Sequence, residues 1–207
     1  MNFPSKLIED AVNEFASLPG IGKKTALRLV LHLLKEKMEV ANHFSDTIKK
    51  MRNEIRFCKQ CHNVADGEFC SICISKSRDQ STICVVENIR DLIAIESTQQ
   101  FNGVYHLLGG IISPLDGIGP DNIQIDSLIE RVKMNEVKEI IMALNPTIEG
   151  DTTVFYISKK LSSFPVHISS IARGIAFGSE LEYTDEVTLA RSIERRLPYE
   201  NQLADRS

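Results

Sequence analysis

The chain of 207 residues lacks the features that would place it in or across a membrane. No apolar run approaches the roughly 18 to 20 residues that a membrane-spanning helix needs. The first residues, Met1–Lys6, lack the apolar region of a secretory signal peptide. Internal repeats and low-complexity segments are also absent. We therefore expect a cytoplasmic globular protein without a membrane partner, with one large domain or a few small ones.

The chain also lacks the glycine-rich loop ending in Gly-Lys-Ser/Thr that holds nucleotide phosphates. An acidic stretch at 174–189 resembles the second nucleotide-binding element of NTPases, but without the loop we do not expect a complete NTPase. This stretch also contains Leu181 and Tyr183, which we expect to be buried. It is therefore predicted to be a loop and short helix that pack against another domain or subunit.

Cysteine is scarce, yet four of the five cysteines fall in one C-x₂-C-x₈-C-x₂-C array: Cys58, Cys61, Cys70 and Cys73. Two C-x₂-C pairs supply the four thiolates of a tetrahedral Zn²⁺ site, and four protein ligands make that site structural. Two disulfides or free thiols are the alternatives, and a cytosolic chain disfavours disulfides. His62 could in principle replace one of the four sulfurs as a metal ligand. The fifth cysteine, Cys84, lies in an apolar run and is expected to be a buried apolar residue.

Positive charge is concentrated near the N-terminus, although the net charge is −4. Residues 1–60 hold 11 of the 24 Lys and Arg and 7 of the 28 Asp and Glu, a balance of +4, which leaves −8 for the rest. Phosphate binding depends on local potential, so this distribution favours a polyanion contact in the N-terminal part. The alternative is a solvated, lysine-rich helix surface.

The basic part is predicted to be helical. Apolar periodicity predicts a helix over 5–17, a second from Lys23 to Lys37 and a third that begins near Asn42. The first two are joined by Leu18-Pro-Gly-Ile-Gly-Lys-Lys-Thr25.

This connection resembles a helix-hairpin-helix motif, which holds the DNA backbone without reading bases. Gly20 and Gly22 let the backbone approach another surface closely, and the free N–H groups at the start of the second helix suit a phosphate. Lys23, Lys24 and Arg28 stand beside that helix end. We therefore predict that these five residues contact DNA; the alternative is a helix connection without a ligand.

The rest of the chain alternates strands and helices, which predicts a mostly parallel sheet with helices on its faces. The expected strands cover 82–86, 104–108, 137–144 and 166–171, and the expected helices cover 88–97, 127–133, 151–161 and 185–197. A second glycine-rich stretch at 116–121 lacks following lysines and is predicted to be a loop.

Two acidic segments follow strands of this sheet. Together they resemble the Toprim domain of topoisomerases and primases, which holds Mg²⁺ with a glutamate after its first strand and an Asp-x-Asp-x-Glu-Gly stretch after a later one. Glu87, Glu149 and Gly150 match this pattern, but Asn145 and Thr147 replace the two aspartates.

Because Mg²⁺ needs anionic oxygens, these replacements predict weak or absent Mg²⁺ binding and no phosphoryl transfer. Glu87, Glu149 and Asp151 form the remaining acidic edge, which would suit a basic partner surface. Capping of the helix that begins near Gly150 is the simpler account of the last two carboxylates.

The order of these parts resembles the RecR family of bacterial recombination mediators over essentially the whole chain. The resemblance implies a multi-domain α and α/β protein that acts with RecO and RecF to load RecA at single-stranded DNA gaps, as a ring-like homotetramer. The predicted parts are a helix-hairpin-helix region, a zinc module, a Toprim-like domain and an acidic C-terminal segment, at 1–56, 57–76, 80–174 and 175–207.

Three hypotheses about function remain at this point. The first is a non-catalytic DNA-binding scaffold that recruits partners in DNA repair. The second is a Mg²⁺-dependent nuclease or primase-like enzyme that uses Glu87, Glu149 and Asp151. The third is a protein-interaction module whose lysines are incidental.

Overall fold

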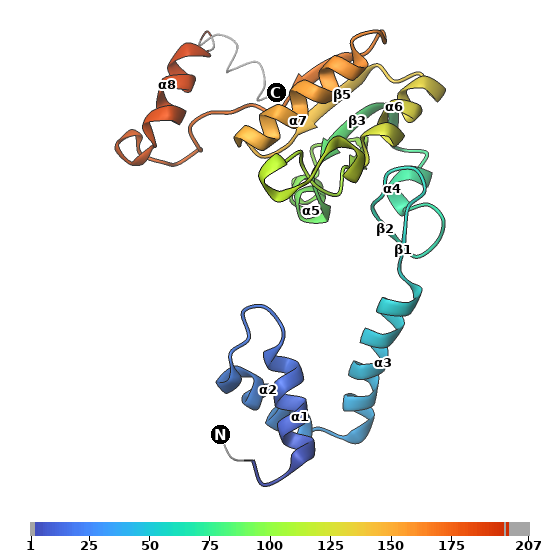
Figure 1. Ribbon diagram of the computed structural model, residues 1–207, viewed down its shortest axis with the longest axis vertical. Helices are drawn as coiled ribbons and strands as arrows, with labels where there is room; N and C mark the ends of the chain where they lie inside the picture. The colour runs from blue at the N-terminus through green and yellow to red at the C-terminus, as the bar shows by residue number, and fades with distance from the viewer. Residues whose placement is uncertain (1–2, 197, 199–207) are drawn as a thin grey trace. The chain divides into compact units, whose positions relative to one another are not determined.

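The computed structural model describes residues 3–196 and 198 (Figure 1). The chain divides into two compact units, Met1–Ile55 and Arg56–Ser207. In the described part of the chain, no helix is long and apolar enough to cross a membrane.

The first unit consists of the helices α1 (Lys6–Ala16), α2 (Lys23–Lys35) and α3 (Met38–Glu54). Its small core joins α1 to α2 and consists of Val12, Ala26 and Val30, with half-buried apolar residues around them. The ring of Phe15 stacks on that of Phe44 at 6.4 Å between centroids, which attaches α3 to this pair. The helical periodicity of apolar residues therefore predicted all three helices, although not the start of the third.

The third helix begins four residues earlier than predicted. Lys37 occupies the N-cap position in an extended conformation, so Asn42 lies inside α3 and is not its cap. Glu36 and Lys37 are the two extended residues that separate α2 from α3. The turn is made by backbone geometry alone, which explains why no capping side chain marked it in the sequence.

The second unit opens with a small module, in which β1 (Arg56–Phe57) pairs antiparallel with β2 (Val64–Ala65) and the short α4 (Ser71–Ile74) follows. A four-stranded parallel sheet comes next, in the order β4-β3-β5-β6. Its strands are β3 (Asp79–Val86), β4 (Gly103–Leu107), β5 (Glu139–Ala143) and β6 (His167–Ser170). The helices between them are α5 (Ile89–Ser97), α6 (Ile125–Met134) and α7 (Ile148–Leu161).

Side chains alternate between the two faces of this sheet. Ile83 and Val85 of β3 join the larger core with α6 and α7, whereas Cys84 and Val86 face the smaller core with Leu92 of α5. Helices therefore cover both faces of the sheet (Figure 1). Cys84 is buried, as its apolar neighbours predicted. The predicted fold class, a helical N-terminal region followed by a parallel α/β domain, is confirmed.

The long loop after β4 is more structured than its composition indicated. It contains the short 3₁₀ turns η1 (Pro114–Asp116) and η2 (Pro120–Asn122), and Ser113 and Ile118 exchange two backbone hydrogen bonds. The amide of Ile112 donates to Thr153 Oγ1 at 2.9 Å, which fastens the loop to α7.

The C-terminal segment differs from its prediction in two respects. The helix α8 covers Glu186–Glu194, so it is shorter than expected, and position 197 lies outside the described residues. Leu181 and Tyr183, which we expected to be buried, form the exposed turn η3 (Leu181–Tyr183) with 62% and 79% of their surfaces accessible. The prediction was wrong for the single chain, because nothing among the described residues covers these side chains.

Candidate metal centre and nucleic-acid interface

The four cysteine side chains of the array meet in one buried cluster. Their sulfur atoms all lie within 4.8 Å of one another, and the Sγ atoms of Cys61 and Cys70 are 3.5 Å apart. Cys58 and Cys61 belong to the turn between β1 and β2, while Cys70 caps α4 and Cys73 lies within it. None of the four forms a disulfide, so the disulfide alternative is not what the structure shows.

This cluster is positioned to bind a metal ion. Four sulfurs placed about 2.3 Å from Zn²⁺ in a tetrahedron would be about 3.8 Å from one another, which fits the observed group. The thiols of this cluster are coupled, because the hydrogen bond between Cys61 and Cys70 lowers the pKa of Cys70 and raises the pKa of Cys61. Within residues 3–196 and 198, no other group of His, Cys, Asp and Glu side chains is placed to share an ion.

Backbone hydrogen bonds shape the first sulfur pair. Cys58 N donates to Asn63 O at 2.7 Å, and His62 N donates to Cys58 O at 3.0 Å. His62 takes a left-handed conformation, with φ of 61°, which turns the chain back after Cys61. Its side chain is not part of the cluster of ligand atoms, and Nε2 makes a 2.8 Å hydrogen bond with Ser127 Oγ on α6. His62 is therefore a docking residue and does not replace a sulfur.

The cysteine module is joined to the edge of the parallel sheet. Leu107 N on the edge strand β4 donates to Cys61 O at 2.9 Å. The half-buried Ile72 of α4 packs against the cysteine cluster and against both cores of the sheet. The module and the α/β domain therefore share apolar contacts and backbone hydrogen bonds, and the sequence did not predict this seam.

The predicted DNA-contacting residues gather at one end of α2, and all five are exposed: Gly20, Gly22, Lys23, Lys24 and Arg28. Gly20 has φ of 80°, a conformation that favours glycine, and Ile21 N donates back to Leu18 O at 3.1 Å to close the hairpin. Gly22 is the N-cap of α2 and offers no capping side chain. The first amides of α2 therefore lack a side-chain cap, at an end flanked by two lysines, which suits a phosphate oxygen.

The acidic edge of the sheet holds its carboxylates in separate interactions. The side-chain amide of Asn145 donates to Glu87 at 3.3 Å, which links the ends of β3 and β5. Asp151 pairs with Arg173 at 2.7 Å, and this arginine holds the pKa of Asp151 below its usual range. Sequence reasoning missed Arg173, because its partner lies 22 residues away and across the sheet edge.

The segment that replaces the Toprim aspartates has a structural role of its own. Thr147 is the N-cap of α7, and its hydroxyl accepts a hydrogen bond from Gly150 N at 3.0 Å. A Cβ atom at Gly150 would collide with the carbonyl oxygen of Asn145, so only glycine fits this turn. Capping, which was the simpler account of this stretch, is thus provided by Thr147, while Glu149 and Asp151 lie in the first turn of α7.

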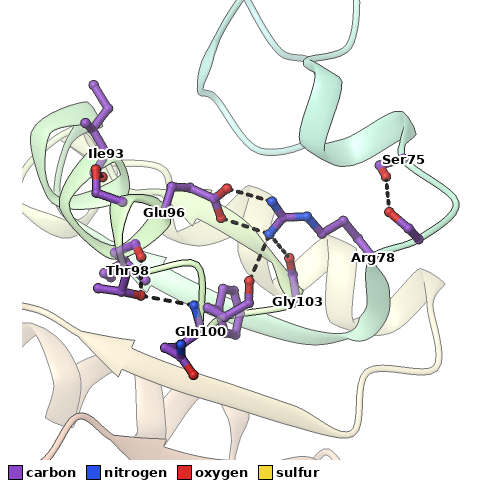
Figure 2. A network of polar contacts seen from close by, with 11 residues as sticks. Ser75, Arg78, Ile93, Glu96, Thr98, Gln100 and Gly103 are labelled. Carbon is purple, nitrogen blue, oxygen red and sulfur yellow. Dashed lines mark hydrogen bonds and ion pairs between the residues drawn. The ribbon is translucent and has the colours of Figure 1, made fainter.

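A second ion pair between an arginine and a carboxylate stabilises the start of the sheet. Figure 2 shows Arg78, just before β3, in a two-pronged contact with Glu96 of α5, at 2.8 and 2.6 Å. The same guanidinium donates to the carbonyl oxygens of Phe101 and Gly103 at 3.1 and 3.4 Å. The contact holds α5 against the beginnings of β3 and β4.

Comparison with known proteins assigns each part of the chain. Family models for the RecR helix-hairpin-helix, the RecR zinc finger with four cysteines, the Toprim domain and the RecR C-terminal region match residues 8–52, 55–75, 81–172 and 174–196. The Recombination protein RecR of Cytophaga hutchinsonii is 59% identical over 97% of this chain and 98% of its own length. The chain belongs to the RecR family. The RecR proteins of Amoebophilus asiaticus and Phocaeicola vulgatus are 58% and 60% identical, over 96% and 94% of this chain and 100% and 95% of their own lengths.

Membership of the RecR family makes this a recombination protein of DNA repair. It also confirms the resemblance drawn from the order of motifs. The cysteine cluster lies within the match to the RecR zinc finger, and the glycine hairpin lies within the match to the helix-hairpin-helix.

Proposed function

We propose that this protein is a non-catalytic, zinc-stabilised DNA-binding scaffold that works with RecO and RecF to load RecA at single-stranded DNA gaps in the cytoplasm. The observation that supports it best is the exposed hairpin of the first unit, where an uncapped helix end, Lys23 and Lys24 lie together. Such a site contacts phosphates in any sequence. Retention of a labelled oligonucleotide that falls steeply as salt rises would support this; salt-independent or absent retention would contradict it.

We further propose that Cys58, Cys61, Cys70 and Cys73 hold one structural Zn²⁺. The convergence of the four sulfurs supports zinc, and four protein ligands leave no position open for water or substrate, which assigns the ion to folding. Metal analysis of protein purified without chelator should find one zinc per chain. Protein that is folded and contains no metal would refute the assignment.

The protein is proposed to act as a ring-like homotetramer. Two apolar surfaces support self-association: one face of α3, and the C-terminal segment. On α3 and at its C-cap the exposed large side chains recur at spacings of four, three and four: Phe44, Ile48, Met51 and Ile55. In the C-terminal segment they are Phe177, Leu181, Tyr183 and Val187. Large exposed apolar patches mark interaction surfaces.

Light scattering tests the tetramer directly. Replacing Ile48 by Asp should lower the solution mass, whereas replacing the exposed Lys49 beside it by Ala should leave the mass unchanged. A wild-type mass of one chain at micromolar concentration, with or without DNA, would contradict the ring.

The acidic edge at Glu87, Glu149 and Asp151 is proposed as a contact for a basic partner surface, with RecO or RecF as the candidates. Mg²⁺ binding there should be weak or absent, because Asn145 and Arg173 already engage two of the carboxylates. Glu149→Lys should impair partner binding more than DNA binding. Metal-dependent cleavage of DNA that is lost in Glu87→Ala would overturn this proposal and restore an enzyme.

A further inference from the structure

Arg131 of α6 is a buried cation without an acidic partner among the described residues. Its side chain and backbone together are only 7% exposed. Nη1 donates to the carbonyl oxygen of Tyr105 at 2.7 Å, whereas Nη2 is buried and makes no hydrogen bond within the described chain. Burying a charge without a counter-charge is costly, so the position of this guanidinium calls for an explanation.

The position of Arg131 in α6 directs it toward the cysteine module. Ser127 lies one helical turn before it on the same face of α6, and Ser127 makes the 2.8 Å hydrogen bond with His62 of the module. Tyr105, which accepts from Arg131, is two residues before Leu107, whose amide donates to Cys61 O. The guanidinium thus lies at the seam where α6, β4 and the module meet.

The negative charge available at this seam belongs to the cysteines. Burial lowers the pKa of Arg131, and the charges that oppose this effect are those of Cys73, Cys61, Cys58 and Cys70. Four thiolates around a divalent ion leave a net charge of about −2 on the centre. Such a centre in a buried environment needs compensation, and outer-shell partners commonly provide it.

We propose that Arg131 is the counter-charge of the metal centre: its guanidinium offsets the thiolates of the zinc-bound cysteines and so couples metal binding to the folding of the α/β domain. This rests on the proposal that the four cysteines hold Zn²⁺, which metal analysis tests by itself. It goes beyond that proposal, because it assigns a residue of the Toprim domain to the metal site. The competing account gives Arg131 only a packing role through Tyr105.

Two variants of Arg131 and one control variant distinguish a counter-charge role of this residue from a packing role. Arg131→Met keeps the length of the side chain and removes its charge, while Arg131→Lys keeps the charge. Arg78→Met is the control, because it removes a half-buried arginine of the same unit whose partner is the carboxylate of Glu96. Zinc affinity of each full-length protein is measured by competition with a chromogenic chelator.

We expect Arg131→Met to weaken zinc binding about 10- to 100-fold, the range found for outer-shell partners of metal sites. Arg131→Lys should lose clearly less, and Arg78→Met should bind zinc like the wild type. Zinc affinity of Arg131→Met within about twofold of the wild type, or equal losses for the Met and Lys variants, would overturn the proposal.

Hydrogen exchange of the wild-type protein gives a test that does not depend on a folded variant. Removing zinc leaves Arg131 without its counter-charge, so amides of α6 and β4 should lose protection together with those of the cysteine module. The hydrogen bonds of the seam come from α6, β4 and the module, so amides of α7 serve as the internal reference. Loss of protection confined to residues 55–75 would overturn the proposal even if metal analysis had found zinc.

Discussion

Replacing Lys23 and Lys24 by glutamine should weaken DNA binding and flatten its dependence on salt. Both side chains are exposed at the start of α2, beside the uncapped helix end at Gly22. The change removes two positive charges and leaves the core of the unit, Val12, Ala26 and Val30, untouched. The fold and the zinc content should therefore stay as they are in the wild type.

The size of the effect follows from counterion release. Each phosphate contact contributes about −0.9 to the slope of log K against log salt, so two lost contacts should flatten the slope by about 1.8. At about 0.1 M salt the same two contacts amount to roughly a 60-fold loss of affinity, or about 2.5 kcal/mol. A larger loss would mean that the lysines also position the helix end on the backbone.

Fluorescence anisotropy of a labelled oligonucleotide, measured from about 50 to 200 mM salt, gives both quantities. The matched control is the double replacement of Lys49 and Lys50 by glutamine. These two lysines are also adjacent and exposed in the first unit, but they lie on α3, away from the hairpin. Their replacement removes the same charge and should change the slope little.

Equal losses in the two double variants would refute the hairpin as the contact, because general positive charge would then explain binding. An unchanged slope in the Lys23 and Lys24 variant would refute it as well. Gly22→Ala adds a further check. The added methyl group meets no atom of the protein within 4 Å, so weaker binding would report a close approach of DNA to the backbone.

Three other outcomes are expected. Cys70→Ser should lose zinc, as metal analysis will show, and lower the melting temperature, because structural metal binding contributes directly to folding. Glu96→Gln should cost about 1.5–3 kcal/mol near neutral pH, because it removes the negative charge that pairs with Arg78 and one of the two acceptor oxygens. Arg78 lowers the pKa of Glu96 in the native state, so the unfolded chain takes up a proton at this carboxylate first as the pH falls through about 4. The wild type then loses the stability that the charged Glu96 provides. The difference in unfolding free energy between wild type and variant, measured by urea titration, should therefore shrink. Gly150→Ala should cost about 1–3 kcal/mol in the same titrations, since the collision with the Asn145 carbonyl outweighs the higher helix propensity of alanine.

The sequence predicted the elements whose side chains repeat with a regular period. Strand β3 is the best case, because its continuous apolar run indicated burial on both faces, and Ile83 and Cys84 do enter different cores. The cysteine cluster was equally predictable, since C-x₂-C spacing is a local property of the chain. The start of α3 was not, because Lys37 and Met38 carry no capping side chain that would mark it.

Contacts between distant segments escaped sequence reasoning for a different reason. Arg131 was interpreted as part of an ordinary helix, and only the fold brings it to the carbonyl oxygen of Tyr105, 26 residues earlier. His62 was weighed as a metal ligand, but its partner is Ser127, 65 residues away. Periodicity shows which residues are buried and gives no information on which of the buried polar groups meet.

Asn145 and Thr147, which stand where the Toprim pattern has two aspartates, help to decide between the scaffold hypothesis and the enzyme hypothesis. The amide of Asn145 donates to Glu87, so this carboxylate has a favourable neighbour without a cation. An aspartate at the same position would place a second negative charge about as close, and a cation or a shared proton would be needed to offset the repulsion. Thr147, in turn, caps α7 with its neutral hydroxyl. Two carboxylates of this edge thus contact Asn145 and Arg173, which supports the proposed binding surface over a metal-dependent active site.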